Sequence, residues 1–294
     1  MIRLSGNEGM TAKPELARIE EPGKNWSLRA FPNLFPAASS GERSHFLVEP
    51  AEAVVIINAH GAHEVIVETE VHDEDFAKIP VWKVFNLLHV SMDRMKALYA
   101  DPKIFFVQIF KNFGEVAGAS LDHPHCQIIA LPHIPEKISE RMHNCRQRKM
   151  QMGKDPFVEV IELADVHKLV IEDTDHFLCY APYDSKMPFE MAVMPKENVA
   201  RLEHSRQHFQ ELATLISRTF RRLENVVKEL PPFNMMLEEA PPSVYLHPEE
   251  FFRWRWRVIP RLTKMAGFEL ATGYYINSLP PERAAEAMHK VKLS

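Results

Sequence analysis

Hydrophobic positions change their period along the chain, and each change predicts a different element of secondary structure. A continuous apolar run at residues 53–57 and a second strand-like segment at 64–69 flank residues 60–63, which predicts a β-hairpin. From residue 80 to 100, apolar side chains recur at every third or fourth position, which is the pattern of a helix with one apolar face. Pro80 favours a helix that begins at this point.

The first half of the chain continues with two further segments that predict strands. They occupy residues 104–110 and 123–131, and a glycine-containing loop at 112–122 separates them. Residues 1–24 are polar and contain Gly and Pro, so we expect them to form an arm outside the core.

The second half repeats this order of elements. The predicted elements are a hairpin at 177–181 and 190–194, a long helix at 206–229, and strands at 234–237 and 254–259. We therefore predict an α+β fold of two duplicated tandem units, each an antiparallel sheet with packed helices. The units span residues 1–150 and 151–294. A chance match between two unrelated α+β halves is the alternative.

Composition limits the classes of function that this sequence can have. Hydrophobic residues make up 46% of the 294 positions, which is enough for a sizeable core. Lys and Arg number 35 against 40 Asp and Glu, and the net charge of -5 argues against a general nucleic-acid binder. The three cysteines form no C-x-x-C pair, so we expect a reducing compartment, the cytoplasm. No apolar run approaches the ~18 residues that a membrane span needs, and we expect neither export nor a membrane partner.

One segment, residues 118–127, concentrates the side chains that can carry chemistry. It reads Gly-Ala-Ser-Leu-Asp-His-Pro-His-Cys-Gln. On a strand, alternate side chains point to the same face, so His123, His125 and Gln127 line one wall while Cys126 turns to the packed side. Pro124 cannot donate a hydrogen bond to a neighbouring strand, which places it at a strand start or edge and His125 at the mouth of a site.

The imidazole of His125 can serve as a nucleophile, a general base or a metal ligand, and each role needs different neighbours. A nucleophile needs one ring nitrogen free and the other donating to a backbone carbonyl, with donors such as Ser120 and Gln127 near a phosphoryl group. A zinc ligand needs further His, Cys or carboxylate groups, and His72 is the obvious candidate. Two histidines that cap a strand for packing reasons are the structural alternative.

The same residues carry a resemblance to a known family. His123-Pro124-His125-x-Gln127, preceded by Asn112-x-Gly114 and Gly118-Ala119-Ser120, resembles the signature of the galactose-1-phosphate uridylyltransferase branch of the histidine-triad superfamily. Further matching motifs lie along nearly the whole chain, at residues 31–36, 61–65, 68–72, 259–261, 266–269, 273 and 276–277. Triad hydrolases of the superfamily have a third histidine where this chain has Gln127, so the resemblance implies group transfer rather than plain hydrolysis.

The resemblance also implies an architecture, a reaction and a set of site residues. The chain would form two tandem histidine-triad folds, the first catalytic and the second degenerate, and would assemble as a homodimer. A nucleoside diphosphate sugar would donate its nucleotidyl group to His125 and release a hexose 1-phosphate, and a second phosphate would then accept the nucleotide. By matched position, Asn33 and Phe35 would lie by the nucleoside, Asn112, Gly118, Ser120 and Gln127 by the phosphates, and Glu269 by the sugar hydroxyls.

The zinc site of the family is altered in this sequence. Members that bind zinc use a C-x-x-C pair near the start, a later histidine and the first histidine of the H-P-H motif. Here Met1 and Leu4 stand where the cysteines would be, and only His72 and His123 remain. Two imidazoles make an incomplete zinc site, and a hydrogen-bonded histidine pair is the alternative.

The second half departs from the family as well. Some relatives carry H-x-H and a downstream Glu at a structural iron site, but this chain has Arg253, Arg255 and Arg257 in that register. A guanidinium group cannot ligate a metal, so we expect no iron site. The three arginines would share one face of a strand, where they either pair with local acids such as Glu249 and Glu250 or bind substrate phosphate.

Three functions are compatible with these residues. The leading hypothesis is a hexose-1-phosphate nucleotidyltransferase of the uridylyltransferase type, which uses a covalent nucleotidyl-histidine. In the second, a nucleotide-sugar or dinucleotide phosphorylase, inorganic phosphate replaces the hexose 1-phosphate as acceptor. In the third, the protein has kept the nucleotide pocket but lost turnover.

Overall fold

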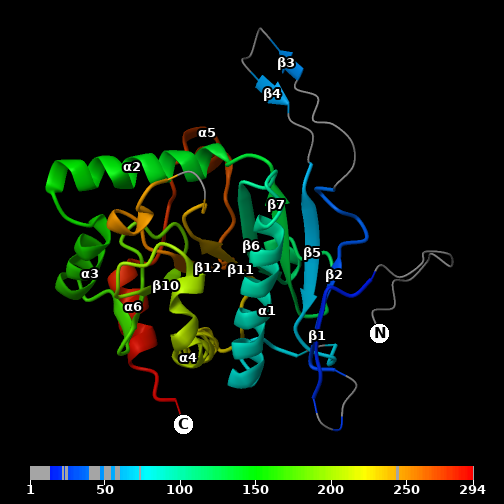
Figure 1. Ribbon diagram of the computed structural model, residues 1–294. Coiled ribbons are helices and arrows are strands. Elements are labelled where there is room, and N and C mark those ends of the chain that lie inside the picture. Colours follow the sequence, from blue (N-terminus) through cyan, green and yellow to red (C-terminus); the bar gives the residue numbers. More distant parts are fainter. Residues whose placement is uncertain are drawn as a thin grey trace.

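The computed structural model describes residues 14–21, 23, 26–39, 60–72, 74–242 and 245–293, together with the backbone of two short strands, Leu47–Glu49 and Val54–Ile56. A ten-stranded antiparallel sheet runs through the molecule and helices cover it (Figure 1). Its strands are β1 (Ala17–Ile19), β2 (Leu28–Pro32), β5 (Ala62–Val67), β6 (Phe106–Phe113), β7 (His125–Leu131), β8 (Val170–Asp173), β9 (Phe177–Tyr180), β10 (Met191–Pro195), β11 (Phe233–Glu238) and β12 (Arg255–Pro260). The short strands β3 (Leu47–Glu49) and β4 (Val54–Ile56) pair with each other in a separate sheet.

The helices separate into long ones that pack on the sheet and short ones in the connections. The α-helices are α1 (Val81–Tyr99), α2 (Glu136–Met152), α3 (Pro156–Val166), α4 (Phe209–Val227), α5 (Gly267–Thr272) and α6 (Pro281–His289), and the 3-10 helices are η1 (Glu115–Ala117), η2 (Leu202–His208) and η3 (Pro248–Glu250). Within the described ranges, no helix combines the length and the apolar character that a bilayer-spanning segment needs.

The predicted duplication is visible in the order of the strands. The first half contributes β2-β5-β7-β6 and the second half contributes β11-β12-β10-β9, which is the same arrangement in reverse. The two halves meet where β6 pairs with β11, and one continuous sheet results. In each half, a long helix, α1 or α4, lies between the second and third strands of the unit. The tandem α+β fold is thus confirmed. The boundary between residues 150 and 151 stays a prediction, and it falls near the end of α2.

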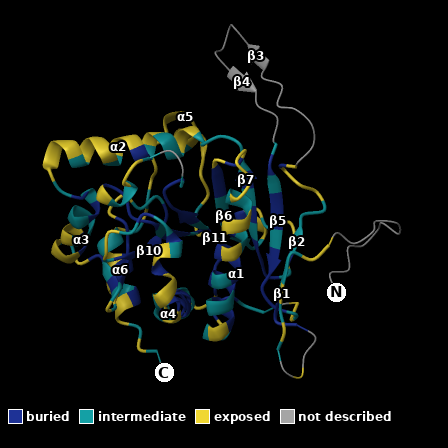
Figure 2. Cartoon of the chain, in the orientation of Figure 1, coloured by how far each residue is buried: buried dark blue, intermediate teal, exposed yellow. Residues whose placement is uncertain are grey.

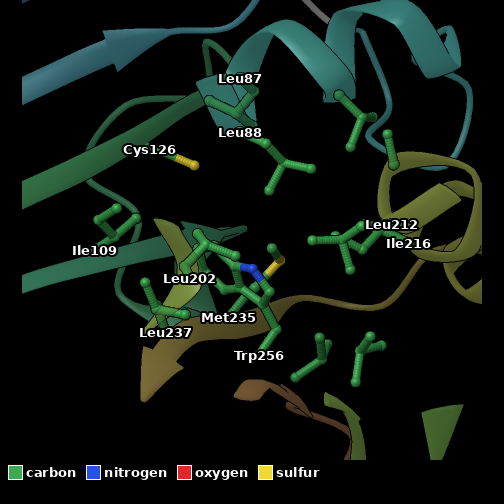
Figure 3. Packing of buried hydrophobic residues seen from close by; sticks show 14 of the residues in the cluster. Leu87, Leu88, Ile109, Cys126, Leu202, Leu212, Ile216, Met235, Leu237 and Trp256 are labelled. Atoms are coloured by element: carbon green, nitrogen blue, oxygen red, sulfur yellow. The ribbon is translucent and has the colours of Figure 1, made fainter. Parts of the chain in front are cut away.

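The main core lies between one face of the sheet and the pair of helices α1 and α4. Along α1, buried apolar residues recur at Val84, Leu87, Leu88 and Met95, as the sequence pattern predicts. They meet residues of α4 and of the inner strands, among them Ile109, Cys126, Leu212, Ile216, Met235 and Trp256 (Figure 3). Because this cluster draws on both halves, the two units share one core.

A second, smaller core covers the opposite face of the sheet in the second half only. Met142 of α2 and Phe157 of α3 pack there against Tyr180, Ala192 and Met194 of β9 and β10. The outer side of α2 is exposed and Met142 is its one buried residue (Figure 2). In the first half, polar side chains occupy this opposite face, and they form the candidate site described below.

Two expectations for the N-terminal region differ from the structure. The predicted hairpin between 53–57 and 64–69 is wrong, because β4 pairs with β3 and β5 pairs with β2 and β7. The reason is that β5 is an inner strand whose two edges are already paired, one with β2 and the other with β7, so neither edge is left for β4. The arm at residues 1–24 is described at 14–21 and 23, and there Ala17–Ile19 forms the edge strand β1 beside β2.

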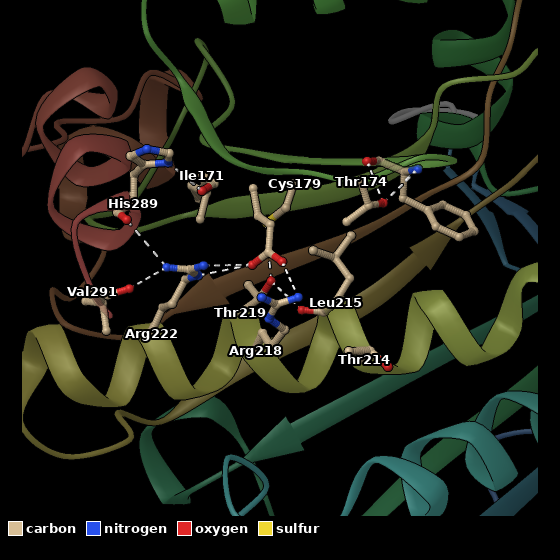
Figure 4. Close-up of polar contacts among 12 residues, drawn as sticks. Ile171, Thr174, Cys179, Thr214, Leu215, Arg218, Thr219, Arg222, His289 and Val291 are labelled. Carbon is tan, nitrogen blue, oxygen red and sulfur yellow. Dashed lines mark hydrogen bonds and ion pairs between the residues drawn. The ribbon is translucent and has the colours of Figure 1, made fainter. Parts of the chain in front are cut away.

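The polar side of α4 anchors the C-terminal segment of the chain. Arg222 donates to Glu172 of β8 and to the backbone carbonyls of His289 and Val291 (Figure 4). Arg218 pairs with the same Glu172. These contacts fix α6 against β8 and α4, so the end of the second unit is held by charge-assisted hydrogen bonds as well as by apolar packing.

Gly61 immediately precedes β5 and lies very close to the backbone of β7. Its φ is +144°, and a Cβ atom built there would lie 1.9 Å from the carbonyl oxygen of Ala130 in β7. Gly153, at the end of α2, has a φ of +73° and open space around it. Gly153→Ala should cost about 1 kcal/mol because only the left-handed conformation is penalised. Gly61→Ala should cost at least about 3 kcal/mol, since backbone must also move.

Urea unfolding of the two variants measures this difference directly. Equal losses of unfolding free energy in Gly61→Ala and Gly153→Ala would show that the β5–β7 approach tolerates a side chain at residue 61.

Candidate active site

The loop that precedes β7 is shaped by two glycines and held by a residue from the other half of the chain. Gly114 and Gly118 have φ values of +80° and +83°, which L-residues with a side chain rarely adopt. Asn234 of β11 lies opposite Asn112 of β6, and its Nδ2 donates to Asn112 Oδ1 and to the carbonyl of Ala117, both at 2.8 Å. The backbone around the predicted phosphate-binding residues is therefore fixed by the second unit.

His125 is the first residue of β7 and has the hydrogen bond that a nucleophilic imidazole requires. Its Nδ1 lies 2.8 Å from the carbonyl oxygen of His123, so Nδ1 carries the proton and Nε2 has a free lone pair. Only 5% of the residue is exposed. Burial is the main cause that lowers the pKa of His125, and the ammonium of Lys111 lowers it further, although the carbonyl of His123 acts in the opposite direction. The ring is consequently neutral at pH 7.

Gln127 shares the face of His125, and His63 orients it. His63 Nδ1 accepts from the backbone N–H of Ala37 at 3.1 Å, so the proton sits on Nε2, which donates to Gln127 Oε1 at 2.9 Å. The NH2 group of Gln127 remains as a donor. Burial lowers the pKa of His63, which keeps this ring neutral too. The sequence reasoning missed His63, although it stands in the 61–65 motif and, two residues before Val65, faces the same side of the sheet as Gln127.

Asn33 joins this group and Phe35 stands at its margin. The backbone N–H of Asn33 donates to the carbonyl of His63 at 2.7 Å, and the Asn33 side chain contacts the His63 ring. Asn33 Oδ1 accepts from the backbone N–H of Phe35 at 3.0 Å, which closes a tight turn. The ring of Phe35 is 72% exposed. Asn33, His63, Gln127 and the Phe35 turn therefore form one connected group on β2, β5 and β7.

A buried ion pair supports His125 from the helix side of the sheet. Lys111 and Glu68 are 1% and 2% exposed, and Lys111 Nζ lies 2.8 and 3.0 Å from the two carboxylate oxygens. The same Nζ donates to the backbone carbonyl of His125 at 3.2 Å. Neither residue was predicted as part of the site. A signal existed, because alternation places Lys111 on the core side of β6 with Ile109, where a lone charge requires a partner.

Cys126 belongs to this ion pair rather than to the reactive face. Its thiol donates to Glu68 Oε1 at 2.9 Å, and the residue is 2% exposed. Burial raises the pKa of the Cys126 thiol well above its ordinary value, and the neighbouring Glu68 carboxylate adds to the effect. Cys126 is therefore a protonated packing residue, in agreement with its predicted orientation.

Other predicted site residues are not joined to His125. Ser120 is exposed in the loop, and no hydrogen bond in the described part of the chain links it to His125 or Gln127; Gly118 is exposed in the same loop. Glu269 is partly exposed and accepts from the backbone N–H of Ala266 at 3.0 Å, so its carboxylate caps α5. Two cavities in the described part of the chain, of about 390 and 360 Å³, are lined by residues of the second unit and of α1, and His125 lines neither of them.

His72 and His123 lie together, as predicted for the zinc ligands that remain. Their Nδ1 atoms are 3.2 Å apart, and His123 Nε2 lies 2.7 Å from the carbonyl oxygen of Thr69. This spacing is close to the ~3.3 Å between two ligands of a tetrahedral zinc ion, and it also fits a hydrogen bond between the rings. Among the described residues, no third His, Cys, Asp or Glu completes a metal-binding set with them. The described residues thus provide two of the four ligands of a closed zinc site.

The three arginines of the second unit are paired with buried acids. Arg253 contacts Asp155, Arg255 contacts Glu238, and Arg257 contacts Glu190. Pairing with acids was expected, but Glu249 and Glu250 are the wrong partners, because the true ones lie on neighbouring elements across the sheet. Arg141 of α2 also binds Glu238.

The pKa of Glu238 shows how strongly the neighbouring arginines stabilise its negative charge. Burial alone would raise its pKa, but Arg255 and Arg141 outweigh burial and lower the pKa to about 2. The pairs that Glu238 forms with Arg141 and Arg255 therefore join α2, β11 and β12.

The arrangement around His125 suits covalent transfer of a phosphoryl-type group. A neutral imidazole presents Nε2, its other nitrogen is fixed to a carbonyl, and the amide of Gln127 is oriented by His63. Such donors stabilise charge on the oxygens of a transferring group because they need no reorganisation during the reaction.

Comparisons with known proteins show the family of this chain. Residues 52–293 match a protein-family model described as Domain of unknown function (DUF4921). The chain is 30% identical to ADP-glucose phosphorylase of Arabidopsis thaliana over 96% of its own length and 79% of that protein. It is also 30% identical to galactose-1-phosphate uridylyltransferase of Thermotoga maritima, over 80% of this chain and 76% of the relative.

Solved structures give the same result. A crystal structure of an ADP-glucose phosphorylase from Arabidopsis thaliana with bound ADP-glucose superposes with a TM-score of 0.84 at 29% identity, covering 96% of this chain and 88% of that one. A uridylyltransferase structure superposes with a TM-score of 0.81 at 22% identity, covering 91% and 86%, which shows a shared fold. The chain therefore belongs to the galactose-1-phosphate uridylyltransferase family of the histidine-triad superfamily, and it is an enzyme of that family.

Proposed function

We propose that this enzyme transfers a nucleotidyl group from a nucleoside diphosphate hexose to a phosphate acceptor, with His125 as the covalent carrier. The hydrogen bond from His125 Nδ1 to the carbonyl of His123 carries the proposal, because it leaves Nε2 unprotonated in a buried ring. A general base would need the same lone pair, but Gln127, in place of a third histidine, provides a donor that favours phosphoryl transfer over activation of water.

The reaction proceeds in two displacements. In the first, Nε2 attacks the α-phosphorus, a P–N bond forms, the bond from phosphorus to the bridging oxygen breaks, and hexose 1-phosphate leaves with that electron pair. The positive charge on the ring is stabilised by the carbonyl of His123, which accepts from Nδ1. In the second, an oxygen of the acceptor phosphate attacks phosphorus, the P–N bond breaks, and Nε2 recovers its lone pair.

The remaining predicted residues take part through binding. Asn33 and the exposed ring of Phe35 contact the nucleoside, and Asn112, Gly118, Ser120 and the Gln127 amide contact the phosphates. Phe110 of β6 lies opposite Gln127 of β7, so Asn112, two residues after Phe110, faces the same side of the sheet as Gln127, which supports this assignment. Ser120 and Gly118 reach the phosphates from the exposed loop.

The identity of the acceptor separates two versions of this function. If the acceptor is hexose 1-phosphate, the enzyme is a nucleotidyltransferase of the uridylyltransferase type. If the acceptor is inorganic phosphate, the enzyme is a nucleotide-sugar phosphorylase. The relative named ADP-glucose phosphorylase matches nearly the full length of this chain, which supports the second version as strongly as the first.

A homodimer is part of the same proposal, and the segment around α5 supports it. Four large side chains there, Phe268, Leu270, Tyr274 and Ile276, are each more than half exposed. A second copy of the chain would cover them. It would also bring the Glu269 of one subunit to the sugar site beside the His125 of the other, which accounts for the separation of these residues within one chain.

Zinc and the cellular location complete the proposal. Zinc is a weakly held ion at His72 and His123, and no step of the reaction passes through it. Cys126, Cys145 and Cys179 are free thiols, which supports a reducing location such as the cytoplasm.

The covalent intermediate can be tested by intact-mass analysis. Wild-type protein and His125→Gly are incubated separately with UDP-glucose and ADP-glucose. We expect a nucleotidyl adduct on the wild type alone, and its mass identifies the base. Addition of inorganic phosphate or of galactose 1-phosphate to the isolated adduct then identifies the acceptor from the nucleotide product released. An adduct of equal yield on His125→Gly would overturn the assignment, and tight nucleotide binding without any adduct would favour the non-catalytic alternative.

The Lys111–Glu68 pair predicts a change in the pH profile of adduct formation. Because the folded-state pKa of His125 is lowered, the reactive neutral ring persists below the ordinary imidazole range, and the rate falls only as pH decreases through this lowered pKa. In Lys111→Met, one cation that lowers the pKa is gone and Glu68 is unpaired. The acid limb should shift to higher pH, and stability should fall by about 3–5 kcal/mol.

Lys111→Arg is the matched control, since it retains the charge beside Glu68. Single-turnover rates between pH 5 and 8 with all three proteins, each checked for folding by circular dichroism, make the comparison. A folded Lys111→Met protein with an unshifted acid limb would mean that the pair does not influence His125.

Mixing two inactive variants tests the shared site of the proposed dimer. Glu269 is partly exposed and glutamine has nearly the same shape, so Glu269→Gln should fold normally while its turnover falls at least about tenfold. After subunit exchange, an equal mixture of His125→Gly and Glu269→Gln should regain about a quarter of wild-type activity, because half the dimers are hybrids with one intact site in two. A mixture no more active than Glu269→Gln alone would place Glu269 outside the partner's site.

A further inference from the structure

A second cluster of potential metal ligands lies in the second unit, away from His125. His176 stands between β8 and β9, His208 ends η2, and Glu211 lies in the first turn of α4. Within the part of the chain that the structure describes, this is the one group of three or more His, Cys, Asp or Glu residues whose donor atoms all lie within 4.8 Å of one another. Neither the sequence motifs nor the proposed reaction uses these residues.

The three side chains are already in contact. His176 Nδ1 lies 2.6 Å from Glu211 Oε2, and the backbone N–H of His176 donates to Glu211 Oε1 at 2.9 Å. The rings of His176 and His208 are stacked, with centroids 3.5 Å apart and an angle of 22° between their planes. Two imidazoles and a carboxylate are therefore held together by elements from three places in the sequence.

To hold an ion, at least one of the stacked rings must rotate, so that the in-plane lone pairs of both imidazoles point to one position. Bonds of ~2.0–2.1 Å to a tetrahedral zinc ion put neighbouring ligand atoms ~3.3 Å apart. The His176–Glu211 pair at 2.6 Å must open slightly, and the widest pair must close by roughly 1.5 Å. His176 and Glu211 side chains are 35% and 26% exposed, so they can rotate without displacing the core.

The surroundings leave room for an ion and for a water ligand. A cavity of about 390 Å³ is lined by His208 and Glu211 together with Thr174, Gln210, Thr214 and Arg218. The one cation in this lining, Arg218, is turned to Glu172 on β8, and Nη1 lies 3.0 Å from that carboxylate (Figure 4). Glu172 also binds Arg222, so one positive charge remains nearby and makes the site a moderate rather than a tight binder.

We propose that His176, His208 and Glu211 bind a divalent transition-metal ion, with zinc as the preferred class and water as the fourth ligand. Imidazole nitrogen with one carboxylate is a donor set for zinc, copper or nickel, whereas calcium and magnesium prefer oxygen alone. The ion replaces the proton shared by His176 and Glu211 and ties the segment before β9 to the start of α4. Its role is structural, because no reacting group of the proposed transfer lies here.

Zinc binding by the full-length chain tests this proposal. The His72→Ala background removes the other histidine pair. After treatment with EDTA, this protein is titrated with zinc chloride by isothermal calorimetry, and one equivalent should bind and raise the thermal unfolding midpoint. His208→Gln and Glu211→Gln, made in the same background, should each weaken binding at least tenfold. His204→Gln is the matched control, since His204 lies in η2 four residues before His208 but outside the cluster, and it should bind as before.

Cobalt provides a second measurement that needs no variant of the cluster. Co²⁺ added to the His72→Ala protein should give the visible absorption of a four- or five-coordinate ion. The proposal is overturned if the spectrum is that of aqueous Co²⁺, if no zinc binds to the His72→Ala protein, or if zinc affinity is unchanged in a folded His208→Gln or Glu211→Gln variant.

Discussion

The hydrogen bond between His125 Nδ1 and the carbonyl of His123 is the constraint on which the chemistry of this protein depends. It decides which ring nitrogen is protonated, and burial keeps the ring neutral, so Nε2 has the free lone pair that the proposed nucleophile needs. The carbonyl of His123 is held in place because His123 stands just before β7 and its Nε2 binds the carbonyl of Thr69. The buried Lys111–Glu68 pair fixes the carbonyl of His125, two residues further on. The proposed reactivity of His125 thus depends on backbone carbonyls that the side chains of His123, Lys111 and Glu68 hold in place.

The two units of the sheet differ in what covers the face that is opposite to α1 and α4. The first unit keeps one face of its sheet free of helices and places His125, Gln127 and Asn112 there. The second unit covers the same face with α2 and α3 and fills it with paired charges, among them Arg253 with Asp155 and Arg255 with Glu238. Its contribution to the first unit is support, since Asn234 binds Asn112 and the carbonyl of Ala117.

Much of the fold could be predicted from the sequence because its signals are local. The apolar period gave α1 and α4 to within a few residues, and alternation gave the opposite orientations of Gln127 and Cys126. The pairing of β4 with β3, by contrast, depends on which strand is central, and a periodic pattern does not contain that information. The partners of Arg253, Arg255 and Arg257 lie across the sheet, so searching nearby in sequence selected Glu249 and Glu250 wrongly. His63, Lys111 and Asn234 were missed for the same reason, because each contacts a residue that is far away in the sequence but close in the folded sheet.

The β6–β11 pairing at the centre of the sheet also has a consequence for dividing the chain. Either unit, taken alone, would present a long strand, β6 or β11, with an unsatisfied row of backbone donors and acceptors along its border. Such a border readily recruits another strand. Separate fragments that each contain one repeat should therefore expose a surface that promotes aggregation, which the intact chain keeps covered.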